Sequence, residues 1–430
     1  MDRFIIEGGS PLRGTTRVRG SKNASLPLLA AALLTEGPVS LRGVPDLADT
    51  RNMRRLLEAI GCELTAEAGS VVVRAGAGAS PHAPYEIVRT MRASICVLGP
   101  LLARFGRARV ALPGGCAIGP RPVDLHLKGL EALGAAITLD SGDVVAEAPR
   151  GRLRGATVFL GGAMGSTVLG TANVMCAATL AEGVTVIESA ACEPEIVDLA
   201  RLLSSMGARV SGAGSPRITV EGVDLLEGAD HTVIPDRIEA GTLMAAAAAT
   251  RGDVTLENCP IDTMLAFTVK LREIGVTLDI KDDSDPLRST VRVCLDERPG
   301  PTEITTQPHP GFPTDLQAQT MALLTLADGH SVITEKIFPE RFLHVAELGR
   351  MGAKIFRQGG SAVVSGEQRL IGAPVMASDL RASAGLVIAG LAAEGTTIVN
   401  RVYHIDRGYQ RLEETLVSLN ARIQRTEDSS

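Results

Sequence analysis

A repeated junction between a helix and a strand is the feature that most restricts the fold of this chain. At six places, helices of small apolar residues end near a glycine and run into a strand rich in β-branched residues, as in LLAAALLTEGPVSL. A second recurring segment is an amphipathic helix such as LLEAIGCEL, which stops at glycine, or at Asn420 in the last copy, before a short strand. The glycines of the first kind of junction lie about 70 residues apart: Gly37, Gly106, Gly183, Gly252, Gly329 and Gly395. Regular self-similarity of this kind predicts a chain built from copies of one structural unit.

Each copy is expected to fold as strand–helix–strand–helix–strand–strand. Glycine at the end of the amphipathic helix supplies a left-handed residue without a Cβ clash. One such unit cannot bury both its helices and its sheet, so several must pack together. Because 430 residues exceed what one core normally supports, we expect two α/β domains of three units each. The Ala-rich helices are apolar on most faces, which predicts that they lie inside a ring of sheets.

Composition excludes several classes of protein. Apolar residues make up 45% of the chain and charged residues 21%, as in soluble globular proteins. No apolar run reaches the roughly 18 residues of a membrane span, and the first residues do not form a signal peptide, so a cytoplasmic protein is expected. The net charge of −6, without a dense basic block, argues against nucleic acid and membrane partners. Seven cysteines, with no CxxC or Cys/His spacing, support neither a disulfide framework nor a metal site.

The segment GSKNASLPLLAAALL, residues 20–34, places a cation at the start of a buried helix. Lys22 is the only lysine among the first 127 residues, and Asn23 follows it. A lysine there opposes the helix dipole, but together with the backbone amides it would form an anion site. A lysine in a solvated turn is the alternative.

The segment LPGGCAIGPRPVDLHLKGL, residues 112–130, is rich in glycine and proline and is expected to be a loop. It carries Cys116, with Arg121, Asp124 and His126 following on the same turn as groups that could bind phosphate or amide. A thiol in an exposed loop beside a cation is accessible and can have a lowered pKa. The alternative is an inert loop cysteine. The other six cysteines lie in or beside apolar runs and are expected in the core.

Three further segments carry polar residues that the repeat does not explain. In TMRASICVLGP, Arg92 enters an apolar helix. In PHPGFPTDLQAQ, three prolines precede Asp315, which is expected at the start of a helix. The alternative is that Asp315 only caps that helix. In YHIDRGYQR, two of the three tyrosines of the chain flank Asp406 and Arg407, and a surface ion pair is the alternative.

Together these segments resemble the enolpyruvyl transferase family, in the branch that uses a nucleotide sugar. The resemblance covers essentially the whole chain and includes ACEPEIVDLA (191–200), PDRIEAGT (235–242), ERFLHVAEL (340–348) and SDLRASA (378–384). It implies a two-domain inside-out α/β barrel of six βαβαββ repeats, three per domain, with the active site in the interdomain cleft. Residues 22–230 would form the domain that carries the Cys116 loop, and residues 1–21 plus 231–430 the domain that carries Asp315. The chain would cross between them near 20–22 and 229–232.

The resemblance also implies an activity. The enolpyruvyl group of phosphoenolpyruvate would pass to the 3′-hydroxyl of UDP-N-acetylglucosamine by addition and elimination, with release of phosphate. This is the first committed step of peptidoglycan synthesis, which serves the cell wall, cell shape and cell division. No cofactor or metal is implied, and the partners are the two small-molecule substrates.

Residue roles are carried over position by position from the family. Cys116 would be the general acid toward C3 of phosphoenolpyruvate and could form a covalent adduct with it, Asp315 would accept the hydroxyl proton or orient that oxygen, and Lys22 is the third catalytic group. The residues expected to bind phosphoenolpyruvate are Lys22, Asn23, Arg121 and Arg407. Those expected to bind UDP-N-acetylglucosamine are Asn23, Arg92, Arg121, Pro122, Val123, Asp124, Leu125, Asp315 and Ile337. Arg237, Arg341, Asp379 and Arg381 are expected to support the site.

One segment departs from the family pattern. In LGGAMGSTVLGTANVM, residues 160–175, Gly165 stands where a lysine is expected and Leu169 replaces a glycine, which weakens the nucleotide contacts expected at 165–168. Two other functions stay open. A transferase acting on shikimate 3-phosphate would share the fold and reaction, although GSKNAS and Cys116 favour the nucleotide sugar. A repeat-built binding protein without catalysis is the second alternative.

Overall fold

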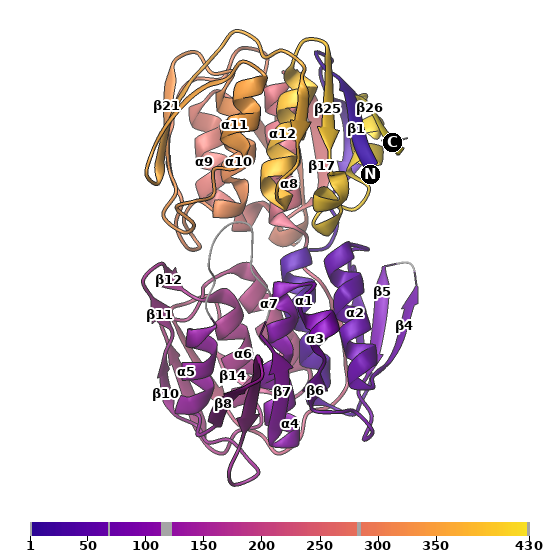
Figure 1. The fold of residues 1–430 in the computed structure, drawn as a ribbon, viewed down its shortest axis with the longest axis vertical. Helices are drawn as coiled ribbons and strands as arrows, with labels where there is room; N and C mark the ends of the chain where they lie inside the picture. Colours follow the sequence, from indigo (N-terminus) through magenta and orange to yellow (C-terminus); the bar gives the residue numbers. More distant parts are fainter. Residues whose placement is uncertain (1, 68, 113–122, 282–284, 428–430) are drawn as a thin grey trace. The chain divides into compact units, whose positions relative to one another are not determined.

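A computed structural model of the chain describes residues 2–67, 69–112, 123–281 and 285–427 (Figure 1). The described chain divides into two compact units. We call the described residues within 20–112 and 123–234 the N-terminal unit, and those within 2–19 and 235–427 the C-terminal unit. The N-terminal unit therefore extends a few residues beyond the expected boundary at 230, because strand β16 (Ala229–Thr232) pairs in parallel with β3 (Val39–Arg42) of the same unit.

The N-terminal unit contains three four-stranded sheets and one short hairpin among its described residues. The first sheet has the order β16-β3-β5-β4, with β5 at Ser70–Arg74 and β4 at Glu63–Glu67. The second is β6 (His82–Ala83), β7 (Arg107–Ala111), β9 (Asp143–Glu147) and β8 (Ala136–Asp140). The third is β10 (Thr157–Phe159), β13 (Val184–Glu188), β15 (Arg217–Glu221) and β14 (Arg209–Ser211). The hairpin joins β11 (Gly161–Gly162) to β12 (Gly165–Ser166).

The C-terminal unit contains three further four-stranded sheets in its described part. One is β2 (Arg13–Arg17), β17 (Asp253–Cys259), β19 (Ser289–Cys294) and β18 (Thr277–Lys281). The next is β20 (Glu303–Thr305), β21 (His330–Thr334), β23 (Ser361–Ser365) and β22 (Lys354–Gln358). The last is β24 (Pro374–Met376), β25 (Thr396–Asn400), β1 (Asp2–Glu7) and β26 (Arg422–Glu427).

All six of these sheets share one pattern of strand directions. Read in the order given, the first pair of strands is parallel and the two following pairs are antiparallel. In the last sheet the third position is taken by β1, from the start of the chain, which lies between β25 and β26.

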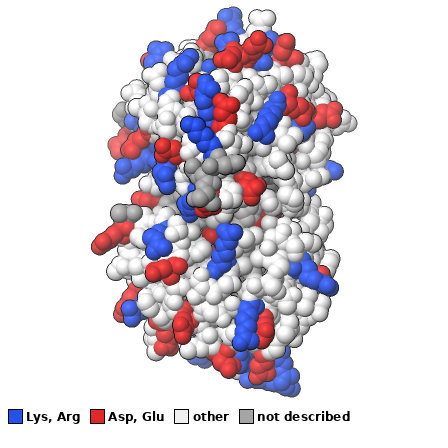
Figure 2. Space-filling model, turned by 180° about the vertical axis from the view of Figure 1, so that it is seen from behind, with Lys and Arg blue, Asp and Glu red and all other residues white. Residues whose placement is uncertain are grey.

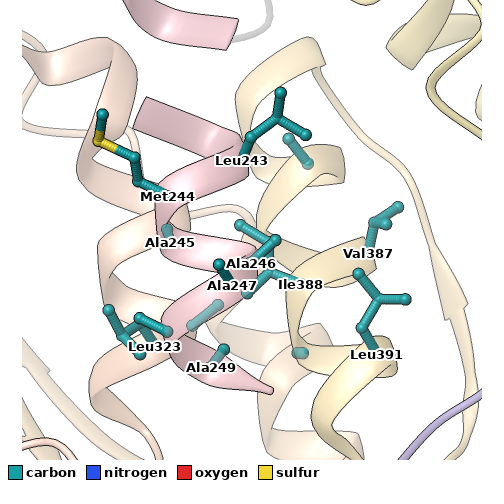
Figure 3. Packing of buried hydrophobic residues seen from close by; sticks show 14 of the residues in the cluster. Leu243, Met244, Ala245, Ala246, Ala247, Ala249, Leu323, Val387, Ile388 and Leu391 are labelled. Atoms are coloured by element: carbon teal, nitrogen blue, oxygen red, sulfur yellow. The ribbon is translucent and has the colours of Figure 1, made fainter. Parts of the chain in front are cut away.

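Buried helices fill the interior of each unit. In the N-terminal unit these are α1 (Lys22–Ala31), α4 (Leu98–Phe105) and α6 (Val168–Ala178), and in the C-terminal unit α8 (Arg237–Ala249), α10 (Gln317–Leu324) and α12 (Leu380–Ala392). Within the C-terminal unit α8, α10 and α12 pack against one another. Figure 3 shows Ala246 and Ala247 of α8 beside Ile388 of α12. Small alanine side chains allow the helix axes to approach closely, which accounts for a core with few aromatic residues.

In the described chain, six further helices follow the inner ones, one after each. They are α2 (Ala48–Ile60), α5 (Asp124–Ala132), α7 (Pro194–Ser205), α9 (Leu265–Glu273), α11 (His344–Arg350) and α13 (Leu412–Ser418); α3 (Tyr85–Val88) is a single turn. The prediction of left-handed residues at the ends of these six helices is confirmed. Positive φ angles occur at all the predicted positions: Gly61, Gly134, Gly207, Gly275, Gly352 and Asn420.

Acidic and basic side chains are interspersed on the face of the molecule that Figure 2 presents. None of the helices in the described part of the chain combines the length and apolar character needed to cross a membrane.

Candidate functional site

Lys22 is the first residue of α1, as predicted, and Ser21 caps this helix by accepting a hydrogen bond from the amide of Ala24 at 3.2 Å. The Lys22 ammonium lies 2.8 Å from the carboxylate of Asp49, in the first turn of α2. The two side chains are only 12% and 3% exposed. The cation at this helix start is therefore held by a buried carboxylate, and it is not a lysine in a solvated turn. Asn23, beside it, is half-buried.

The second part of segment 112–130 is a helix, so the expectation of a loop throughout was wrong. α5 begins at Asp124, because the residues from there to Ala132 present buried His126, Gly129 and Leu130 on one side. Asp124 is exposed at the helix start, and Val123 and Leu125 are half-buried. Leu125 lies close to the β11–β12 hairpin, since a Cβ placed on Gly162 would be 3.0 Å from Leu125 Cδ1. Residues 123–125, expected to contact the nucleotide, thus lie beside the hairpin that contains Gly165, where the second expected nucleotide segment, 165–168, begins.

His126 is buried and hydrogen-bonded inside the unit, so it is not placed as the phosphate- or amide-binding group that was expected. Its Nδ1 lies 2.9 Å from Nδ2 of Asn173, whose Nδ2 also donates to the carbonyl of Ile95 and whose Oδ1 accepts from the amide of Gly99. The amide nitrogen is a donor, so Nδ1 accepts and the proton of the neutral ring is on Nε2. Burial, and then the charge of Arg92, lower the pKa of His126 to about 4. His126 is therefore neutral at pH 7.

Arg92 opens the 3₁₀ turn Arg92–Val97 that leads into α4, and its side chain is half-buried. Its charge acts on His126, so this arginine and the start of α5 belong to one region of the N-terminal unit. Cys116, Arg121 and Pro122 lie outside the described residues.

Asp315 lies in the 3₁₀ turn Thr314–Leu316, ahead of α10, and caps neither element with its side chain. Its Oδ1 accepts a hydrogen bond from Arg341 Nη1 at 2.8 Å. Its Oδ2 accepts from Nε and Nη2 of Arg381, at 3.2 and 3.0 Å. The two arginine side chains are 6% and 2% exposed, whereas that of Asp315 is 25% exposed. Asp315 is hydrogen-bonded to two buried guanidinium groups and is still partly exposed to solvent. A carboxylate in this position is suited to bind or orient a polar ligand group.

Asp379 supports this cluster from the start of α12. Its carboxylate caps the helix by accepting from the amides of Arg381 and Ala382, at 2.9 and 3.2 Å. The cap fixes the first turn of the helix that carries Arg381.

Glu335 is a second support, which the sequence did not reveal. Its Oε1 accepts from the amides of Ile337 and Phe338, both at 2.9 Å, and its Oε2 accepts from the hydroxyl of Thr314 at 2.9 Å. One buried carboxylate thus ties the turn at Ile337 to the turn that holds Asp315. The amide of Ile337 is already engaged in this way.

The residues of YHIDRGYQR have different roles. Asp406 accepts two hydrogen bonds from Arg425, at 2.9 and 2.7 Å, so it is a structural ion pair. Arg407 is half-buried at the end of the 3₁₀ helix Val402–Arg407. Tyr403 is 47% exposed, whereas Tyr409 is 2% exposed and hydrogen-bonds to Arg381.

Arg237 is the first residue of α8, next to its capping residue Asp236. Together with Phe267, Pro310 and Pro313 it lines a small pocket beside the Asp315 turn.

The described cysteines are all free thiols. Four are buried, but Cys192 and Cys294 are half-buried, so the expectation that all six lie in the core was wrong for these two. Burial raises the pKa of every one of them, to about 11 for Cys62 and about 12 for Cys96 and Cys259. None of the described thiols is therefore activated as a nucleophile near neutral pH. Within the described ranges, no three His, Cys, Asp or Glu side chains are grouped so that they could hold a metal ion.

Comparison with protein families matches residues 6–416 to the model described as EPSP synthase (3-phosphoshikimate 1-carboxyvinyltransferase). A UDP-N-acetylglucosamine 1-carboxyvinyltransferase of Anaeromyxobacter sp. (strain Fw109-5) is 57% identical over 428 residues, covering 99% of this chain and 99% of the relative. A protein of the same name from Methylacidiphilum infernorum is 52% identical, with the same coverage.

Solved structures show the same fold. The enolpyruvyl transferase NikO from Streptomyces tendae superposes with a TM-score of 0.87 at 25% identity, covering 99% of both chains. EPSP synthase from Acinetobacter baumannii superposes with a TM-score of 0.76 at 19% identity, covering 99% of this chain and 100% of that one.

Proposed function

The chain belongs to the EPSP synthase family, and we propose that it transfers the enolpyruvyl group of phosphoenolpyruvate to the 3′-hydroxyl of UDP-N-acetylglucosamine, releasing phosphate. The observation that carries this proposal is identity of 52–57%, over nearly the full length, to relatives named for that reaction. The enzyme would act in the cytoplasm at the first committed step of peptidoglycan synthesis.

Asp315 is proposed to receive the proton of the 3′-hydroxyl, or to orient that oxygen for attack on C2 of phosphoenolpyruvate. The proposal is supported by its geometry, since both carboxylate oxygens are fixed by Arg341 and Arg381 while part of the side chain stays open. Because both carboxylate oxygens already accept hydrogen bonds from arginine, the geometry favours the orienting role.

Phosphoenolpyruvate carries a phosphate and a carboxylate, and Lys22, Asn23, Arg121 and Arg407 are proposed to hold it. Arginine suits this task because its planar fork donates two parallel hydrogen bonds. Lys22 is supported by its place at the start of α1, with its side chain oriented by Asp49.

Cys116 is proposed to protonate C3 as the sugar oxygen adds to C2. The tetrahedral product then expels phosphate and loses a proton from C3, which restores the double bond. A thiol between cations can have a pKa near neutrality and so can both give and take this proton. The proposed reaction needs no metal or other cofactor, because arginine and lysine charges stabilise the anionic intermediate.

The nucleotide sugar is proposed to contact Asn23, Arg92, residues 121–125, Asp315 and Ile337. The position of Leu125 beside the β11–β12 hairpin supports a contribution from that hairpin. Because Gly165 offers no side-chain charge there, backbone groups of the hairpin would make the contact in place of a lysine.

The finer architecture is also proposed on the family resemblance: six βαβαββ repeats, three in each unit, arranged as an inside-out barrel. The common strand pattern of the six sheets supports it. The proposed reaction takes Lys22 from the N-terminal unit and Asp315 from the C-terminal unit, so both units are needed for activity.

Release of phosphate from phosphoenolpyruvate tests the proposal. The assay is run with UDP-N-acetylglucosamine and, separately, with shikimate 3-phosphate, for the wild-type protein, Cys116→Ala and Cys116→Asp. We expect release with the nucleotide sugar alone, none from Cys116→Ala, and partial activity from Cys116→Asp, because a carboxylic acid can also donate the proton.

Release with shikimate 3-phosphate instead would keep the chemistry and overturn the acceptor. A folded wild-type protein that releases phosphate with neither acceptor would indicate the non-catalytic binding protein. A folded but inactive Cys116→Asp would argue against Cys116 as a simple proton donor.

A further inference from the structure

Tyr409 carries a buried hydroxyl to which three inner helices of the C-terminal unit contribute a partner. Its oxygen lies 2.8 Å from Thr242 Oγ1 on α8, 3.1 Å from Gln319 Nε2 on α10 and 3.1 Å from Arg381 Nη1 on α12. The tyrosine itself follows the 3₁₀ helix Val402–Arg407, and only 2% of it is exposed. A phenol in this position is placed to hold other groups and not to meet a ligand.

The direction of each hydrogen bond can be assigned. Arg381 Nη1 and Gln319 Nε2 can only donate, so the Tyr409 oxygen accepts from Arg381. The two hydrogens of Gln319 Nε2 are shared among the Tyr409 oxygen, Thr242 Oγ1 at 3.1 Å and the carbonyl of Asp315. The phenolic hydrogen is then directed to Thr242 Oγ1, which in turn donates to the carbonyl of Ile238 at 2.7 Å. Burial raises the pKa of Tyr409, so the phenol keeps its proton and this polarity is maintained at neutral pH.

The same network holds Asp315 from two sides. Arg381 directs Nε and Nη2 to the Asp315 carboxylate and Nη1 to Tyr409, so all three guanidinium nitrogens are engaged. Gln319 donates to the main-chain carbonyl of Asp315 at 2.9 Å. A guanidinium held along two edges cannot rotate without breaking a buried hydrogen bond, which is costly.

We propose that Tyr409 is a positioning residue for Asp315, acting through the hydrogen bond that its hydroxyl accepts from Arg381. This inference rests on the proposed function, because it assigns Asp315 a task in the transfer reaction. Without the hydroxyl, Thr242 and Gln319 keep other partners, at Ile238 and at the Asp315 carbonyl, but Arg381 Nη1 loses its acceptor. Removing the hydroxyl therefore takes a hydrogen bond from the Arg381 guanidinium, which orients the Asp315 carboxylate.

The test compares Tyr409→Phe with Tyr403→Phe, a matched control at a tyrosine that is 47% exposed. Phosphate release from phosphoenolpyruvate and UDP-N-acetylglucosamine gives kcat and both KM values, and thermal unfolding gives the folded fraction. We expect kcat of Tyr409→Phe to fall about tenfold, with each KM within about twofold of wild type, because the interaction is used at the hydroxyl attack. Tyr403→Phe should keep wild-type kinetics.

A double-mutant cycle with Asp315→Asn separates positioning from a general loss of packing. If Tyr409 acts through Asp315, adding Tyr409→Phe to Asp315→Asn should lower kcat by less than about twofold. The same tenfold loss in both backgrounds, or an unchanged kcat for Tyr409→Phe, would overturn the inference.

Should Tyr409→Phe not fold, Thr242→Val removes the acceptor of the phenolic hydrogen and keeps the side-chain shape. We expect it to lower kcat about threefold with KM unchanged; wild-type kcat would overturn the inference. If wild type and Tyr403→Phe release no phosphate at all, the proposed function fails, and the positioning inference fails with it for that separate reason.

Discussion

Replacing Asp49 by asparagine should destabilise the N-terminal unit, because it removes the charge that holds Lys22. The ammonium and carboxylate are 2.8 Å apart and only 12% and 3% exposed, so water screens the pair little. A hydrogen bond between charged groups contributes about 1.5–3 kcal/mol, and breaking a buried pair can cost more. Asparagine keeps the shape and one acceptor oxygen, so we expect a loss of about 2 kcal/mol.

For a unit of the size of residues 20–234, that loss corresponds to a decrease in Tm of about 4–8 °C. Differential scanning calorimetry at pH 7 measures it directly. Asp46→Asn is the matched control, since Asp46 is 59% exposed and pairs with Arg51, itself 47% exposed. An exposed pair of this kind should contribute less than about 1 kcal/mol.

Equal Tm values for Asp49→Asn and Asp46→Asn would show that the Lys22–Asp49 pair adds no stability and would refute the reasoning. The same pair affects how Lys22 variants are interpreted. Lys22→Ala leaves a carboxylate that is 3% exposed without its cation, so its activity must be normalised to the folded fraction.

Further expected outcomes concern pH and packing. Burial lowers the pKa of His344 to about 4, so between pH 6.5 and 4 the unfolded chain binds more protons, and stability present above pH 6.5 is lost as the pH falls. In urea titrations across that range, His344→Phe should reduce the loss by up to about 3 kcal/mol; an unchanged pH slope would contradict it. Gly99→Ala should cost about 3 kcal/mol, because its Cβ would lie 2.3 Å from the carbonyl oxygen of Asn173. In Gly349→Ala, inside α11, the added carbon meets no atom within 4 Å beyond its chain neighbours and its own helix backbone, so the variant should instead stabilise by about 0.5–1 kcal/mol. Equal denaturation midpoints for these two glycine variants would refute the packing argument.

Much of the fold could be predicted from the sequence, because the determining signals are local. The six amphipathic helices each end in a left-handed residue before the next strand, and glycine or Asn420 stands at each of these positions. The same junction recurs along the chain, so the pattern supports the fold more strongly than any single copy would. The same reasoning failed at 124–130, where proline and glycine just upstream suggested a loop and concealed the start of α5.

The site could be predicted only in part, because its supports depend on contacts between distant residues. Asp315 and Arg381 are 66 positions apart, and Thr242 and Tyr409 are 167 apart, so no local spacing connects them. A usable signal did exist. Thr242, Gln319 and Arg381 are polar residues on the buried inner helices, and a polar group buried there needs a partner. Matching such groups to one another would have suggested the network without identifying Tyr409.

The place of β1 affects the order in which the chain can fold during synthesis. β1 is made before every other strand described here, yet both its neighbours, β25 and β26, come more than 380 residues later, and Asp2 pairs with Glu427. The strands of three sheets all lie within residues 20–234, so the N-terminal unit can fold as soon as it has left the ribosome. At that stage β1 has neither of its partner strands. This sheet can close only after β25 and β26 have been made, and a chain stopped before β25 leaves both edges of β1 unpaired, open to other strands.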